Sequence, residues 1–143
     1  MATITEPKHK EAEERMLLTG IRWDFYTVFR NELKDRPGVR LSYNRGNLEI
    51  MILGLRHEHN KTMLAKLVEM TLFELNLPVE SGGSMPFQRE DLERGFEPDE
   101  CWWIASEAAL RGVEDFDPLQ HPPPDLAIEV EISSSLVNRI DIY

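Results

Sequence analysis

The segment 125–132, with the sequence DLAIEVEI, constrains the fold more than any other part of the chain. Apolar and acidic residues alternate along it, which predicts a β-strand with one apolar and one acidic face. Asp125, Glu129 and Glu131 share the acidic face with Ala127. Three carboxylates on one face repel each other and need compensation. The strand therefore either lies at a solvated sheet edge, or its carboxylates bind a hard cation such as Mg²⁺ or Mn²⁺.

The rest of the chain shows the periodicities of both helices and strands. The strongest signal is an amphipathic helix at 57–76, and Arg45-Gly46 predicts a tight turn that joins strands 39–44 and 47–53 into a β-hairpin. The other expected elements are helices at 8–18, 21–35 and 133–143, a helical turn at 106–110, two short strand pieces in 79–88, a strand at 98–105, and loops at 89–97 and 111–124. This order predicts an α/β (α+β) fold, with a mixed β-sheet flanked by helices.

Composition narrows the class of protein. A length of 143 residues fits one domain over 1–143. No apolar run approaches the roughly 18 residues of a membrane helix, and the N-terminal sequence lacks the apolar core of a secretory signal. Cys101 is the single cysteine, which excludes an internal disulfide. We therefore expect a cytoplasmic protein with no membrane partner.

The formal net charge is −10, which counts against a surface that attracts nucleic acid as a whole. A metal-dependent nuclease nevertheless concentrates carboxylates at its site, where cations offset their charge. Such a protein would still need a local patch of Lys and Arg side chains to hold phosphates.

Three further motifs carry chemically active side chains. Asp99 follows Pro98 at the start of a strand, where its carboxylate can meet one from a neighbouring strand. His57 and His59 have a spacing that can bind zinc from a strand, although at the start of a helix the two rings are poorly aligned. Cys101 lies beside two tryptophans, and a buried thiol is the expected reading because no base is paired with it.

Together these pieces resemble the PD-(D/E)XK nuclease superfamily, in which a Pro-Asp on one strand is followed by an acidic-x-basic triplet on the next. More narrowly, the chain resembles the Uma2 family of restriction-endonuclease-like proteins, in the form abundant in cyanobacteria. The matching stretches are GIRWDFYTVFRNEL, NRGNLEIMILGLRHEHNKTMLAKLVEMTL, FEPDECWWIAS and PPDLAIEVEISSSLVNRIDIY. The resemblance implies a restriction-endonuclease-like fold, and a further helical turn and strand pair beyond Tyr143.

The resemblance also assigns roles to individual residues. It makes Asp99 and Glu129 metal ligands for Mg²⁺ or Mn²⁺, with Glu58 completing the site. The superfamily keeps a lysine two residues after the second acid, and this chain has Glu131 there. Family members often carry a basic residue further along instead, and Arg139 holds that place. Arginine stays protonated, so it can clamp a phosphate but cannot accept a proton.

Two functions follow as hypotheses. The first is a metal-dependent endonuclease that hydrolyses DNA, with Asp99, Glu129, Glu131 and Arg139 as catalytic residues and, by analogy with the superfamily, a homodimer. The second is a catalytically inactive nuclease fold that serves as a binding or assembly module. The missing lysine and the charge of −10 favour the second, and the clustered acids favour the first.

Overall fold

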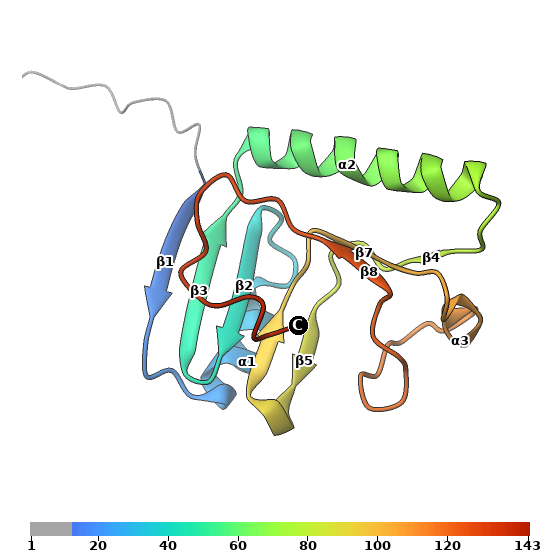
Figure 1. Cartoon of the computed structure of the whole chain (residues 1–143). Helices are drawn as coiled ribbons and strands as arrows, with labels where there is room; N and C mark the ends of the chain where they lie inside the picture. Colours follow the sequence, from blue (N-terminus) through green and yellow to red (C-terminus); the bar gives the residue numbers. More distant parts are fainter. Residues whose placement is uncertain (1–12) are drawn as a thin grey trace, which may run out of the picture.

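The computed structural model describes residues 13–143, and it contains two antiparallel β-sheets and three α-helices (Figure 1). The larger sheet has the order β1-β3-β2-β6-β5, and the smaller has the order β4-β7-β8. Helix α1 covers one face of the larger sheet, and the C-terminal end of the chain crosses the opposite face (Figure 1). The α+β class predicted from the sequence is confirmed. Among the described residues, no helix is long and apolar enough to cross a membrane.

The hairpin of β2 (Val39–Asn44) and β3 (Asn47–Ile52) forms as predicted. Arg45 and Gly46 both have positive φ, 46° and 89°, which is the backbone of a tight turn whose twist matches that of the strands. Helix α1 (Trp23–Leu33) also forms, and it packs Tyr26 against Tyr43 of β2 with ring centroids 4.8 Å apart. This contact is the centre of the first core cluster.

The prediction of a helix at 8–18 is wrong for residues 13–18, the part that the structure describes. Strand β1 (Glu14–Leu18) pairs with β3 at the sheet edge, and the rest of the predicted helix lies largely outside the described residues. Glu, Arg, Met and Leu favour helices locally, but the edge of β3 offers a complete set of backbone partners, and tertiary pairing overrides that weak preference.

The loop predicted at 89–97 contains a second hairpin. Strand β5 (Phe87–Arg89) and strand β6 (Arg94–Phe96) pair across the short 3₁₀ turn η1 (Glu90–Leu92). Glu93 ends this turn with a φ of 50°. A non-glycine residue rarely adopts this left-handed backbone conformation, so nothing in the residue types of this stretch predicts the turn.

The smaller sheet consists of β4 (Glu80–Ser81), β7 (Glu100–Trp103) and β8 (Leu126–Ile128), and α3 (Glu107–Leu110) follows β7. Its core cluster contains Cys101 and Trp103, both almost fully buried as predicted for the thiol. Strand β8 is three residues long, so the strand predicted over 125–132 is too long.

The C-terminal segment, residues 129–143, does not form the predicted helix at 133–143. Carboxylates from distant strands accept its backbone N–H groups, which is why no helix is needed to satisfy them. Glu13 accepts the N–H groups of Ile132 and Ser133, both at 3.1 Å, and Glu49 accepts that of Leu136.

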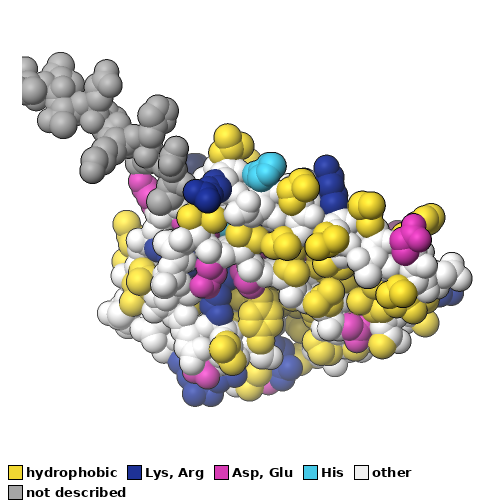
Figure 2. Space-filling model, turned by 45° about the horizontal axis from the view of Figure 1, so that its top comes forward, with side chains coloured by type: hydrophobic (Ala, Val, Ile, Leu, Met, Phe, Trp, Pro, Cys, Tyr) yellow, Lys and Arg dark blue, Asp and Glu magenta, His cyan; other side chains and the backbone are white. Residues whose placement is uncertain are grey.

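Helix α2 (Leu55–Glu74) confirms the strongest helix prediction, but its apolar residues are mainly exposed. Leu67 is 62% exposed, Met70 67% and Phe73 82%, and Figure 2 shows hydrophobic side chains gathered along this part of the surface. Only His57 and Leu72 of this helix are buried in the described part of the protein.

Candidate active site

Asp99 enters the candidate site immediately before β7. Its Oδ2 accepts a 2.7 Å hydrogen bond from the backbone N–H of Val130, whereas its Oδ1 is buried and has no hydrogen-bond partner among the described residues. The N–H of Asp99 donates to the carbonyl of Ile128, the last residue of β8, at the end of the pairing between β7 and β8. Asp99 therefore lies beside the point where the chain leaves β8 and continues into Glu129.

Glu129 is held at both carboxylate oxygens. Its Oε2 accepts a 2.6 Å hydrogen bond from Nη1 of Arg139, and its Oε1 accepts one of the same length from the hydroxyl of Tyr143. Burial raises the pKa of Glu129 above its usual value despite Arg139, and the charge of Asp99 raises it further. The two acids predicted to act together are therefore close enough to interact electrostatically.

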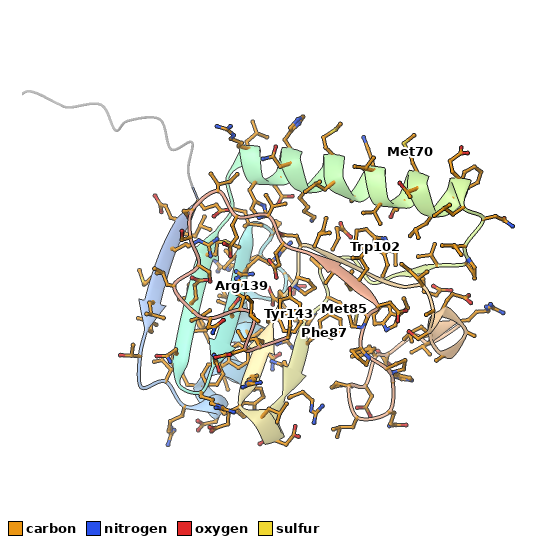
Figure 3. All side chains as sticks on the ribbon, viewed as in Figure 1. Met70, Met85, Phe87, Trp102, Arg139 and Tyr143 are labelled. Carbon is orange, nitrogen blue, oxygen red and sulfur yellow. The ribbon has the colours of Figure 1, made fainter. Side chains whose placement is uncertain are left out.

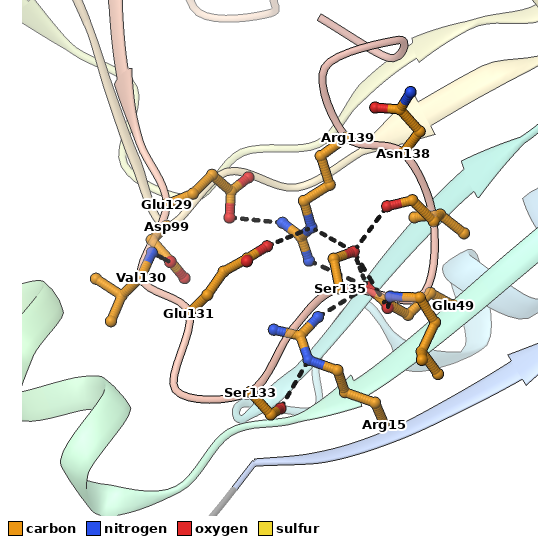
Figure 4. Close-up of polar contacts among 12 residues, drawn as sticks. Arg15, Glu49, Asp99, Glu129, Val130, Glu131, Ser133, Ser135, Asn138 and Arg139 are labelled. Carbon is orange, nitrogen blue, oxygen red and sulfur yellow. Dashed lines mark hydrogen bonds and ion pairs between the residues drawn. The ribbon is translucent and has the colours of Figure 1, made fainter.

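Arg139 is the centre of this cluster (Figure 4). Besides Glu129, its guanidinium contacts Glu49 at 3.3 Å and Glu131 at 3.7 Å, and its Nε donates to the hydroxyl of Ser135. The side chain is 9% exposed, and these three carboxylates raise its pKa against the opposing effect of burial. We call Arg139, Glu49, Glu129 and Glu131 the Arg139 cluster.

Glu131 stands where the superfamily has a lysine, and the structure places it on the Arg139 side of the site. Its side chain is 40% exposed and pairs with Nε of Arg139. The positive charge expected near the acids thus comes from Arg139, ten residues after Glu129 in the chain. Asp125, on the same predicted strand face, instead accepts hydrogen bonds from Ile104 and Ser106 and lies outside the cluster.

Glu49 and Arg15 belong to the site but were missed in the sequence. Glu49 is fully buried and accepts a 2.9 Å hydrogen bond from Nη1 of Arg15 as well as one from Ser135. One signal was available, because Glu49 is a lone charge inside the apolar strand sequence LEIMIL, and a buried charge needs a partner. The residues around Arg15 contain no signal of its role, and the sequence predicts a helix where Arg15 lies in strand β1.

His57 separates Glu58 from Asp99. The buried imidazole has its Nε2 3.2 Å from Asp99 and 3.6 Å from Glu13, and its Nδ1 3.6 Å from Glu58. Burial opposes protonation of this ring, but the three surrounding carboxylates outweigh it and raise the pKa of His57. His59 is exposed, so the two histidines do not face a common zinc site.

The donor set at the site fits a magnesium ion in part. Among residues 13–143 no group of three or more His, Cys, Asp or Glu side chains is arranged to hold a metal. Mg²⁺, however, commonly binds through one or two carboxylates and completes its shell with water and substrate phosphate. The buried, unpaired Oδ1 of Asp99 is a suitable oxygen ligand, whereas Glu129 can serve only after it releases Arg139 or Tyr143.

One comparison with known proteins identifies a relative. The sequence profile of the Uma2 family, described as "Putative restriction endonuclease", matches residues 25–141, which include every residue predicted for the site. No curated protein and no solved structure matches the chain.

Proposed function

Because the chain belongs to the Uma2 family of restriction-endonuclease-like proteins, we propose that it is a divalent-metal-dependent endonuclease that hydrolyses phosphodiester bonds in DNA. One observation carries the proposal. Asp99 is 1% exposed, lies close enough to Glu129 for its charge to raise the pKa of that acid, and keeps one oxygen without a hydrogen bond. Leaving a buried carboxylate oxygen unpaired costs free energy, and a cation ligated there would offset that cost.

Asp99 and Glu129 would hold Mg²⁺ or Mn²⁺ from facing strand ends. When bound, such an ion lowers the pKa of a coordinated water and stabilises charge on the phosphate. Glu58 is proposed as a further ligand from the first turn of α2, and its Oε1 is likewise buried without a hydrogen bond. Because the ring of His57 lies between Glu58 and Asp99, direct ligation by Glu58 requires that ring to move.

Arg139 supplies the positive charge that the missing lysine would supply. In this structure its guanidinium neutralises Glu129, and a substrate phosphate would compete for the same donors. Transfer of Arg139 from Glu129 to phosphate would bind the substrate and free the carboxylate in one movement. Glu131 then remains near Nε of Arg139 and restrains the direction of the guanidinium.

A second function has its own supporting observation. Both carboxylate oxygens of Glu129 accept hydrogen bonds, one from Arg139 and one from Tyr143, so the carboxylate needs no metal as a partner. This is expected for a nuclease fold that acts as a binding or assembly module. The exposed apolar residues of α2 support a homodimer under either function, because contiguous apolar surface commonly marks an interface. Under either function we also propose that the protein resides in the cytoplasm.

Nicking of supercoiled plasmid DNA in Mg²⁺ or Mn²⁺ tests the function. We expect activity in the wild type that is lost in Glu129→Gln, which keeps the shape of the side chain but removes its charge. Glu114→Gln is the matched control, because Glu114 is an exposed acid in a loop outside the site. A folded wild type that neither nicks DNA nor binds Mn²⁺ in a calorimeter would leave the binding module as the function.

A further inference from the structure

A cavity of about 670 Å³ opens beside Glu129. It is lined by the hairpin of β5 and β6, by the loop before β8, and by the end of the C-terminal segment. Its aromatic lining residues are Phe87, Phe96, Phe116 and Tyr143. Figure 3 shows Phe87 and Tyr143 close together on the side of the strands that the C-terminal segment crosses, and Phe96 lies between them, 5.3 Å from the first ring and 4.4 Å from the second. The size is typical of a small-molecule site.

The β5–β6 hairpin places arginines next to these rings. Phe87 pairs with Phe96, and Arg89 pairs with Arg94 two residues further on, so all four side chains belong to the same sheet face. Arg89 is already bound by Asp91 through hydrogen bonds of 2.8 and 2.6 Å. Arg94 has no such carboxylate among the described residues, and its Nε is buried without a hydrogen-bond partner.

These features suit one kind of ligand. Aromatic side chains stack on the face of any of the four nucleobases. A guanidinium without a carboxylate partner can bind phosphate. A base within a duplex is stacked and paired, so its face can reach the aromatic side chains of this half-open cavity only after the base has left the helix. A purely apolar ligand would leave the guanidinium of Arg94 desolvated and unpaired, which is costly.

We propose that the cavity binds one unpaired nucleotide of a DNA strand, with its base against Phe96 and Tyr143 and its phosphate at Arg94. The inference rests on the proposed function, since it names the part of the DNA substrate that lies beside Glu129. It assigns the protein to DNA that is single-stranded, bulged or otherwise unpaired near the reacting phosphate.

Binding in EDTA tests the cavity without cleavage. Fluorescence anisotropy would compare a labelled duplex with one bulged nucleotide at its centre, the fully paired duplex, and the single strand. We expect the two unpaired DNAs to bind at least about fivefold more tightly than the paired duplex, because stacking one base contributes about 1–3 kcal/mol and about 1.4 kcal/mol corresponds to a factor of ten. Equal affinity for all three DNAs would overturn the proposal.

Two variants separate the base from the phosphate. Phe96→Leu should remove most of the preference for unpaired DNA while leaving the salt dependence unchanged. Arg94→Gln should lower the slope of log K against log salt by about 0.7–0.9, the value of one phosphate contact. Arg22→Gln removes the same charge from an exposed position just before α1 and should change neither quantity. If Arg94→Gln and Phe96→Leu both bind as the wild type does, the cavity is not the binding site.

Competition and cleavage distinguish the remaining outcomes. Excess deoxynucleoside monophosphate should displace the bulged duplex poorly, and displacement at equal concentration would reassign the cavity to free nucleotides. Selective binding without nicking would contradict the nuclease and keep the nucleotide site. Nicking of paired DNA, with no preference for unpaired DNA, would keep the nuclease and contradict the nucleotide site.

Discussion

Nη1 of Arg139 lies 2.6 Å from Oε2 of Glu129, and the same guanidinium reaches the fully buried Glu49 at 3.3 Å. One cation thus serves a carboxylate on β3 of the larger sheet and one in the C-terminal segment, directly after β8. Arg15 is the second cation at Glu49, and its other ion pair is with Glu13.

Arg139→Gln should destabilise the protein strongly. The substitution leaves a buried Glu129 without its cation and halves the positive charge at Glu49, and breaking a buried pair from one side costs about 3–5 kcal/mol. Urea unfolding followed by circular dichroism would measure the loss. Arg22→Gln breaks an exposed ion pair and should cost less than about 1 kcal/mol. Similar midpoints for the two variants would show that the Arg139 cluster contributes little to stability.

Tyr143→Phe should open the site at a small cost in stability. It removes the hydroxyl that donates to Oε1 of Glu129, and a hydrogen bond to a charged group contributes about 1.5–3 kcal/mol. If Glu129 is a metal ligand, the freed oxygen should raise the affinity for Mn²⁺, which calorimetry would measure. Lower stability together with unchanged Mn²⁺ binding would remove Glu129 from the list of ligands.

The thiol of Cys101 should resist alkylation in the native protein. Burial raises its pKa from 9.0 to about 12, so the reactive thiolate is scarce at pH 8. Iodoacetamide should label the thiol rapidly in urea and slowly without it, as read by mass spectrometry. Fast labelling under native conditions would mean that the smaller sheet opens readily around β7.

The raised pKa of Cys101 also predicts how the free energy of unfolding depends on pH. Between pH 9 and 12 the unfolded chain loses the Cys101 proton while the native protein keeps it. Stability from this group is therefore fully present below pH 9 and is lost as pH rises toward 12. In Cys101→Ala the free energy of unfolding should fall less steeply with pH just above pH 9, as measured by urea unfolding at several pH values. An unchanged slope would show that the thiol ionises alike in both states.

Gly95→Ala should overpack the contact between β6 and α1. A Cβ at this position would clash with the hydroxyl oxygen of Tyr26 and with two carbons of its ring, and overpacking of this kind costs about 1–3 kcal/mol. Tyr26→Phe removes the oxygen, the nearest of these atoms, so the double variant should lose less stability than the two single variants added together. Strict additivity in thermal unfolding would contradict a direct clash.

Local signals predicted the parts of the fold that depend on neighbours in sequence. The turn at Arg45-Gly46 and the helix α2 follow from residue type and spacing over a few positions. Strand β1 and the C-terminal segment follow from partners far away in the chain, such as Glu13 with Ser133 and Arg15 with Glu49. No window of sequence contains both members of such a pair.

The candidate site divides in the same way. Alternation along 125–132 singled out Glu129, and the Pro-Asp pair singled out Asp99. Their partners were predicted only where the family resemblance named them, as for Arg139. Glu49 stands out in the sequence as a lone charge in an apolar strand and His57 as one of two neighbouring histidines, but only the fold shows that both are buried beside other charged groups.

The hydrogen bonds that Glu13 accepts from the N–H groups of Ile132 and Ser133 join residues about 120 positions apart. Strands β1, β2 and β3 can pair as soon as the ribosome has released them, since their partners are adjacent in the chain. The acceptors on Glu13 and Glu49 must then wait until residues 129–139 have been synthesised. The Arg139 cluster is consequently assembled only after these residues have left the ribosome, and until then the carboxylates of Glu13 and Glu49 lack the backbone donors of Ile132, Ser133 and Leu136.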